Sequence, residues 1–156
     1  MPIARRLERF MKERGVTYDV VLHRPTPSSS KTAEATHISG HNLAKAVVLK
    51  DQDGYAVAVL PASRHVRLNA LQEWLNRNFA LASEEEIGEI FVDCDLGAVP
   101  AVGDAYGLDV LVDNALSDAE DVYIEGGDHK SLLHLTAKEF EHLMEHAEHG
   151  SFSSTV

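Results

Sequence analysis

Residues 43–50 have the sequence LAKAVVLK, an apolar run with a lysine near its start. It is followed by a polar turn, residues 51–54, that ends in Gly54, and then by a second apolar run, residues 55–60. Two runs rich in β-branched and apolar residues on either side of a short glycine-containing turn predict a β-hairpin. We therefore expect residues 44–50 and 55–60 to pair as antiparallel strands.

Further elements are predicted on both sides of this hairpin. Apolar spacing and capping signals predict helices over residues 3–14, 31–37 and 69–77, a short helix after Ser83, and a last helix from Thr136 to about His149. Strands are predicted over residues 17–22, 79–82, 109–112, 122–125 and 132–135, the last two joined across a glycine turn. This irregular mixture predicts an α+β fold with a mixed sheet flanked by helices. We expect one domain over residues 1–149 and a disordered tail over residues 150–156.

The composition limits the cellular setting. The chain has 156 residues, which suits one domain, and a single cysteine, which excludes an internal disulfide and fits a reducing compartment. Its apolar runs are too short to span a bilayer, and no apolar segment typical of a signal peptide follows the start. We therefore expect a cytoplasmic protein without a membrane partner.

Charge is divided unevenly along the chain. Residues 1–78 carry 12 Lys and Arg against 7 Asp and Glu, whereas residues 79–156 carry 2 against 18, which gives the net charge of −11. Such a charge argues against a protein that coats long stretches of nucleic acid, DNA included. A local phosphate contact would involve the first half. The alternative, that the asymmetry reflects only solvated helix faces, stays open.

Lys45 is the first candidate for a functional residue. Strand alternation places it on one face with Val47 and Leu49. A lysine on such a face needs an anionic partner or a route to solvent. The residue pattern alone leaves both possibilities open.

Two glycine-containing loops supply the other candidates. Gly97 and Gly103 flank Pro100, and a loop of this composition can present backbone N–H groups to a developing oxyanion, or can be an ordinary surface turn. Gly127, Asp128 and His129 form a tight turn between two apolar runs. His129 has the chemistry of a positioning group or a general base, and Asp128 that of a turn stabiliser.

Other reactive groups are less convincing. Cys94 lies between two aspartates, which disfavour a thiolate. His142, His146 and Glu145 match a zinc-peptidase string, and His149 would extend it along one helix face, but no clear third ligand accompanies them. We therefore predict no metal and no cofactor.

The order of these motifs resembles the YbaK family, the editing domains associated with prolyl-tRNA synthetase. The resemblance runs from residue 3 to about residue 145 and includes the Lys45 strand, the 97–103 loop, a strand carrying Asp113, and the Gly127-Asp128-His129 turn followed by the Thr136 helix. Some relatives have a second proline in the loop and Asn instead of Asp in the turn. The family's fold is a mixed, partly barrel-like sheet flanked by helices.

The resemblance implies a free-standing aminoacyl-tRNA deacylase. Such a trans-editing hydrolase cleaves the ester of a mischarged tRNA, here tRNA-Pro carrying Ala, Ser or Cys. The expected partners are the acceptor end of the aminoacyl-tRNA and an aminoacyl-tRNA synthetase. Lys45, Gly97 and His129 would be the catalytic residues, and Pro100, Gly103, Gly127 and Asp128 would bind substrate. In this family the terminal hydroxyl of the tRNA and a positioned water are thought to carry the chemistry. The alternative is a non-catalytic module that binds a tRNA 3′ end, a nucleotide or a synthetase.

Overall fold

The computed structural model describes residues 3–24, 32–33, 36–95 and 97–155. The predicted helix over residues 31–37 falls partly outside the described residues. The helices are α1 (Arg5–Glu13), α3 (Leu68–Leu75), α4 (Glu84–Ile90) and α5 (Ala137–Leu143), with short 3₁₀ turns η1 (Gly103–Tyr106) and η2 (Asn114–Leu116). The strands are β1 (Asp19–Leu22), β2 (Leu43–Asp51), β3 (Gly54–Pro61), β4 (Arg64–Val66), β5 (Ala80–Leu81), β6 (Asp109–Asp113), β7 (Asp121–Glu125), β8 (Ser131–Thr136), β9 (Glu148–Gly150) and β10 (Ser153–Thr155).

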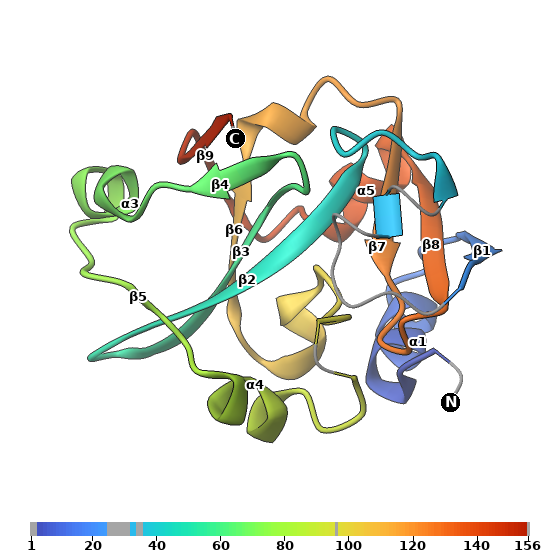
Figure 1. Ribbon diagram of the computed structural model, residues 1–156, viewed down its shortest axis with the longest axis horizontal. Helices are drawn as coiled ribbons and strands as arrows, with labels where there is room; N and C mark the ends of the chain where they lie inside the picture. The colour runs from blue at the N-terminus through green and yellow to red at the C-terminus, as the bar shows by residue number, and fades with distance from the viewer. Residues whose placement is uncertain (1–2, 25–31, 34–35, 96, 156) are drawn as a thin grey trace.

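The predicted mixed sheet with flanking helices is confirmed. Eight strands form one sheet in the order β1-β8-β7-β2-β3-β6-β9, with β5 paired to β2, and β4 pairs separately with β10. The β2–β3 hairpin is antiparallel from Ala44↔Pro61 to Asp51↔Gly54, as predicted. Parallel strands flank it on both sides, β7 on β2 and β6 on β3. Figure 1 shows the hairpin crossing the middle of the molecule.

Strand alternation gives the sheet two apolar faces. One face forms the main core, where Val48, Val57 and Ile124 pack with Leu7 of α1 and Phe140 of α5. The other face carries two smaller clusters. The α3-side cluster is built from Leu49, Ala56, Ala58, Leu60, Leu71, Phe79, Leu111 and Phe152. The β1-side cluster is built from Leu43, Ala62 and Leu132.

Local capping signals are correct at α4 and half correct at α5. The Ser83 hydroxyl accepts from the Glu86 N–H, and the Glu86 carboxylate accepts from the Ser83 N–H; these two reciprocal bonds form a capping box at the start of the helix that was predicted after Ser83. At α5, Thr136 accepts from the Glu139 N–H, but the Glu139 carboxylate accepts instead from the backbone N–H of Thr17. A long-range partner therefore replaces the second half of the box.

The last helix is shorter than predicted. It ends at Leu143, and residues 148–150 form β9, a parallel strand on the open edge of β6. Pairing with β6 satisfies backbone groups of both strands, which a continued helix would have left exposed on the sheet edge. His149 therefore lies on a strand rather than on the same helix face as His142.

The prediction of a disordered tail is wrong for residues 150–155. Ser153–Thr155 pairs with β4, and Phe152 is only 1% exposed. The Asp113 carboxylate accepts from the Phe152 N–H at 2.8 Å and from the Ser153 hydroxyl at 2.8 Å. Phe152 stacks on Trp74, whose ring lies where a side chain at Gly150 would be, so only glycine fits there. The tail is thus part of the fold.

None of the helices in the described ranges has the length and apolar character that a membrane crossing requires.

Replacing Phe152 with Ala is expected to lower the free energy of unfolding by about 3–5 kcal/mol, because a fully buried aromatic ring is lost from the α3-side cluster. Urea unfolding followed by circular dichroism measures this. Thr155→Ala, an exposed change further along the tail, is the control and is expected to alter stability by less than about 0.5 kcal/mol. Equal stability of the two variants would show that the tail does not contribute to the core.

Candidate functional site

Lys45 lies on the sheet face opposite the main core. Its neighbours along β2 are Leu43, in the β1-side cluster, and Val47, which packs on the α3-side cluster, so Lys45 separates the two. Burial lowers the pKa of the Lys45 ammonium below 10.5. Among the described residues it makes no hydrogen bond or ion pair. A half-buried cation that forms no ion pair with a described residue is suited to a bound anion.

A buried carboxylate lies on the neighbouring strand. Ala44 pairs with Ile124 in parallel register, so the residues that follow them, Lys45 and Glu125, occupy the next position on adjacent strands. Alternation puts Glu125 on the Lys45 face, and it is 1% exposed. Sequence analysis missed this residue. The available signal was an acid that ends the apolar run 122–124 directly before Gly126 and Gly127.

The predicted glycine turn continues from Glu125. The Gly126 N–H donates to the Ser131 carbonyl at 2.9 Å and closes the β7–β8 hairpin. His129 has φ 59°, a conformation that few residues other than glycine adopt. The turn therefore holds the His129 backbone in one unusual geometry. It directly follows β7, the strand that pairs with the Lys45 strand β2.

Asp128 is the residue that holds this turn together. Its carboxylate accepts from the N–H groups of Lys130 at 2.9 Å and Ser131 at 2.8 Å and from the Ser131 hydroxyl at 2.8 Å. Burial alone would raise the pKa of Asp128, but these hydrogen bonds outweigh it and lower the pKa below 3.8. The geometry agrees with the turn-stabilising role considered for Asp128. Its predicted contact with substrate stays a prediction.

The residues that come just before the 97–103 loop contact the same turn. The Asp95 N–H donates to the Gly127 carbonyl at 2.7 Å. A side chain at Gly127 (φ 96°) would approach Cys94 Sγ to 3.2 Å and Ala4 Cβ to 3.0 Å, so glycine lets the two loops come together. Gly97 is exposed with φ 83°. The structure thus brings the Gly97 end of the loop to the turn.

The other end of that loop lies elsewhere. Gly103 is buried at the start of η1, where a Cβ would meet Val110 at 2.9 Å and Val57 at 3.0 Å in the main core. Pro100 is also buried. Close packing on Val110 and Val57 therefore explains why residue 103 is a glycine. The predicted roles of Gly103 and Pro100 in substrate binding stay predictions.

Cys94 is chemically unreactive in this setting. Burial, together with the nearby Asp93 carboxylate, raises the pKa of the thiol to about 12. Its sulfur lies 3.2 Å from the Tyr106 hydroxyl, which donates to Asp93 at 2.7 Å. The thiol therefore stays protonated near neutral pH and is not a nucleophile.

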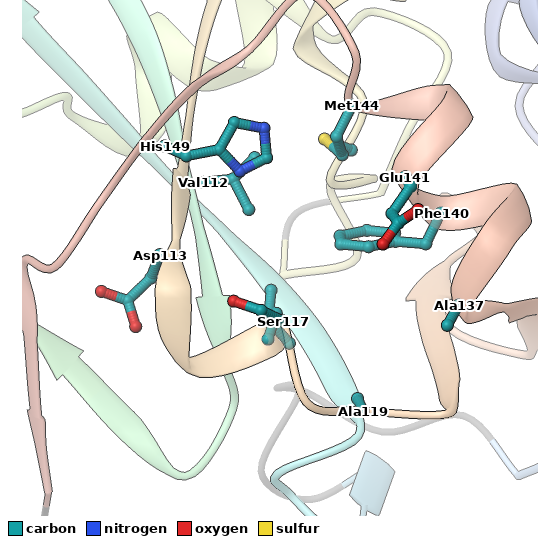
Figure 2. A pocket seen from close by; sticks show the side chains of 10 residues that line it. Val112, Asp113, Ser117, Ala119, Ala137, Phe140, Glu141, Met144 and His149 are labelled. Atoms are coloured by element: carbon teal, nitrogen blue, oxygen red, sulfur yellow. The ribbon is translucent and has the colours of Figure 1, made fainter.

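A separate pocket lies on the other face of the sheet from Lys45. It is bounded by β6, η2, α5 and β9, and residues of the main core form its apolar floor (Figure 2). The volume is about 140 Å³. None of the predicted site residues lines it.

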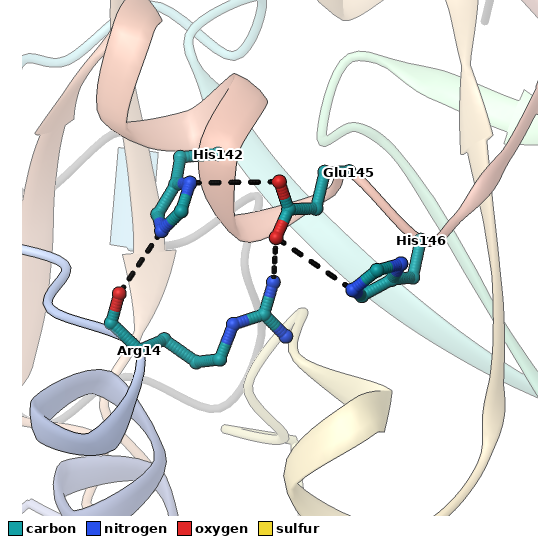
Figure 3. Close-up of polar contacts among 4 residues, drawn as sticks. All are labelled: Arg14, His142, Glu145 and His146. Carbon is teal, nitrogen blue, oxygen red and sulfur yellow. Dashed lines mark hydrogen bonds and ion pairs between the residues drawn. The ribbon is translucent and has the colours of Figure 1, made fainter.

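The histidines near the end of α5 do not form a metal site. His142 Nδ1 and His146 Nε2 each lie 3.6 Å from Glu145, which also pairs with Arg14 (Figure 3). The other His142 nitrogen, Nε2, lies 2.9 Å from the Arg14 carbonyl. Across the described ranges, no group of three or more His, Cys, Asp or Glu residues is arranged to hold a metal ion. The cluster instead ties α5 to α1.

Comparison with solved structures agrees with the fold. The chain is similar to a crystal structure of a candidate trans-editing enzyme for prolyl-tRNA synthetase (TM-score 0.85, 23% identity, 99% of this chain and 98% of that one). It is also similar to the crystal structure of a hypothetical protein, APE2540, with a TM-score of 0.83 and 24% identity; the match covers 96% of this chain and 99% of that one. A candidate signal transduction protein from Marinobacter aquaeolei VT8 has the same fold (TM-score 0.77, 20% identity), where 95% of this chain matches 30% of that one.

Sequence comparison supplies the assignment. Among curated protein sequences none matches this chain significantly. The model of the aminoacyl-tRNA editing domain matches residues 23–143, which include the Lys45 strand, both glycine loops and the buried Glu125. The chain therefore belongs to the aminoacyl-tRNA editing domain family.

Proposed function

We propose that this protein is a trans-editing hydrolase that removes a wrong amino acid from tRNA, with tRNA-Pro carrying Ala, Ser or Cys as the substrate. The family supports an aminoacyl-tRNA substrate. The similarity to a candidate trans-editing enzyme for prolyl-tRNA synthetase supports the choice of tRNA. In the reaction, water attacks the ester carbonyl carbon, the bond to the ribose oxygen breaks, and a proton passes to that oxygen to give free amino acid and uncharged tRNA.

The observation that carries this proposal is the half-buried Lys45. Burial lowers the pKa of its ammonium, which makes no hydrogen bond or ion pair with any described residue. A phosphate near the terminal adenosine would supply the missing anion. Bound in this way, the tRNA end would lie beside Glu125 and the turn that presents His129.

The remaining residues act by positioning. The hydrogen bonds of Asp128 fix the turn, and the Asp95 N–H fixes the Gly97 loop against it. Groups held in place before the substrate arrives lower the entropy lost in reaching the transition state. His129 would orient the ester or the terminal hydroxyl, in agreement with chemistry carried by the tRNA itself.

The charge pattern led us to expect phosphate contacts from cations of the first half of the chain, which include Lys50 and Arg64. Lys50 donates to Glu86 at 2.9 Å, and Arg64 donates to Ser153 at 2.6 Å, so both cations are used within the protein. Arg24 and Lys130 are exposed, and the His23 N–H to Lys130 carbonyl bond brings their segments together beside the turn. These two residues are the better candidates for phosphate contacts.

A non-catalytic module that binds a tRNA 3′ end, a nucleotide or a synthetase is the second candidate. Lys45, which forms no ion pair with any described residue, would serve such a module as well. The two functions differ in turnover, so release of free amino acid from mischarged tRNA under multiple-turnover conditions separates them.

Lys45→Ala and Lys45→Met are expected to lower kcat/KM for mischarged tRNA by about a hundredfold or more, because the substrate end loses its anchoring charge. Both variants should remain folded, and Met keeps the apolar stem of the side chain. Lys50→Ala, on the opposite face of the same strand, is the control and should keep nearly full activity. Activity of the Lys45 variants equal to that of Lys50→Ala would remove Lys45 from the mechanism.

Prolonged dialysis against a chelator is expected to leave deacylation unchanged. In the part of the chain that the structure describes, no set of side chains is placed to hold a metal ion, and the proposed steps need none. The initial rate before and after treatment is the measurement. Loss of activity that zinc restores would contradict the proposed chemistry.

Arg24→Ala and Lys130→Ala are expected to raise KM several-fold with little change in kcat, because they contact phosphates away from the ester. Lys138→Ala, an exposed lysine of α5, is the matched control. The salt dependence of KM should correspond to about two to four phosphate contacts. A steep salt dependence, or no effect of the two substitutions relative to Lys138→Ala, would show that the acceptor stem docks elsewhere.

A further inference from the structure

His23 is a half-buried histidine next to the turn that carries His129. It directly follows β1, and its N–H donates to the Lys130 carbonyl at 2.8 Å. This bond extends the β1–β8 ladder by one residue pair beyond Leu22↔Ser131. Because Lys130 follows His129 in the chain, the extended ladder holds His23 beside the histidine turn.

Strand alternation places His23 on the Lys45 face of the sheet. Glu125 lies at the level of Lys45 and is paired with Leu132 of β8. Leu132 is in turn paired with Val21 of β1, and Val21 packs on the β1-side cluster. His23 lies two residues further along the same ladder, so its side chain is on the same face as Val21.

The ring of His23 is held in one tautomer. Its Nδ1 lies 2.6 Å from the carbonyl oxygen of Arg24. A carbonyl oxygen only accepts hydrogen bonds, so Nδ1 carries the hydrogen and donates it. In the neutral ring the other nitrogen, Nε2, is therefore an acceptor with an available lone pair.

This acceptor is buried. Nε2 of His23 is shielded from solvent and makes no hydrogen bond with any residue that the structure describes. Buried polar atoms are nearly always hydrogen-bonded, because a buried acceptor without a donor lowers stability. A catalytic role is one reason for which a protein keeps such an atom.

The separation of His23 from Lys45 agrees with the layout of the proposed substrate. The two residues are three strands apart, β2 to β1 across β7 and β8, which is roughly 14 Å along the sheet at the usual strand spacing. In the terminal nucleotide, the phosphate and the ester lie on opposite sides of the ribose. A residue that binds the phosphate and a residue that acts on the ester should therefore not be neighbours.

We propose that His23 is the general base of the deacylation, an inference that rests on the proposed editing function. Nε2 takes a proton from water as the water oxygen bonds to the ester carbonyl carbon. The bond from that carbon to the ribose oxygen then breaks, and the proton passes from Nε2 to the ribose oxygen, which restores the neutral ring. The Arg24 carbonyl keeps the ring oriented throughout. The terminal hydroxyl of the tRNA stays available to hydrogen-bond the carbonyl oxygen.

Two substitutions separate proton transfer from hydrogen bonding. His23→Gln keeps an acceptor near the position of Nε2 but cannot take the proton, and His23→Ala removes both functions. We expect both variants to lower kcat for mischarged tRNA by about a hundredfold or more with little change in KM, the loss typical of a missing general base. His65→Gln, at an exposed histidine of β4, is the matched control and should keep full activity.

Binding separates this role from a structural one. The Kd for tRNA that carries alanine through an amide bond should be the same for His23→Gln and the wild type, and thermal unfolding verifies the fold. A kcat of His23→Gln within a few-fold of the wild type, or a Kd weakened as much as kcat is lowered, would overturn the proposal and leave the editing function intact. A wild-type protein that releases no amino acid would overturn the editing function, and this inference with it.

A further measurement needs neither a variant that folds well nor a substrate. Long-range ¹H–¹⁵N spectra of the ¹⁵N-labelled full chain at the assay pH report which nitrogen of each histidine ring carries the hydrogen. We expect His23 to carry it on Nδ1 alone, with Nε2 unprotonated. A hydrogen on Nε2 would overturn the general-base role whatever the activity of the protein.

Discussion

The register of β2 determines which side chains enter the main core and which face the other side of the sheet. This strand pairs with β3, β5 and β7, and its alternation sends Ala44 and Val48 into the main core while Lys45, Val47 and Leu49 face the other way. A shift of one residue would exchange the two sets. Lys45 would then enter the main core without a counter-charge, at a cost far above that of a slipped apolar strand. The same alternation that builds the core thus fixes where the cation stands.

The parallel pairing of β2 with β7 transmits this constraint to the candidate site. Because Ala44 is aligned with Ile124, Glu125 reaches the level of Lys45, and the glycine turn begins directly after it. The turn is then held by bonds to Asp128 and by the Asp95 N–H from the other loop. The lysine, the buried acid and the histidine turn are therefore placed by one register and by a few hydrogen bonds.

Sequence reasoning succeeded where the signal is local. The glycine turn at Gly54 and the reciprocal bonds of Ser83 and Glu86 depend on residues within a few positions, and both were predicted. It failed where distant residues decide. Residues 144–149 were predicted to continue the last helix, but residues 148–150 pair with the open edge of β6, and the tail is ordered because Asp113 lies beside it. In the same way, the Glu139 carboxylate accepts from the N–H of the distant Thr17 rather than from the start of its own helix.

The same distinction applies to the candidate site. Lys45 and the turn at His129 have recognisable local patterns, and the family resemblance added their order. Glu125 belongs beside Lys45 only through the parallel pairing of strands 80 positions apart, which no local pattern reveals. Gly103 shows the opposite case, in which a glycine with a functional appearance is explained by close packing on Val57 and Val110. Local sequence patterns therefore identify candidate site residues, and the pairing of distant strands determines which of these residues lie next to one another.

The lowered pKa of Lys45 links the site to stability. The unfolded chain holds the ammonium with a pKa near 10.5, whereas the folded protein holds it less favourably because of burial. Below both pKa values the side chain is charged in both states, so the folded state bears the full desolvation cost there. The unfolded chain binds more protons between the two pKa values, and the free energy of unfolding contributed by this group rises with pH across that window. A protein that keeps such a cation on an apolar face gives up stability there, and binding of an anion at Lys45 would recover it. The empty protein would therefore be less stable at this position than a complex with the proposed anion.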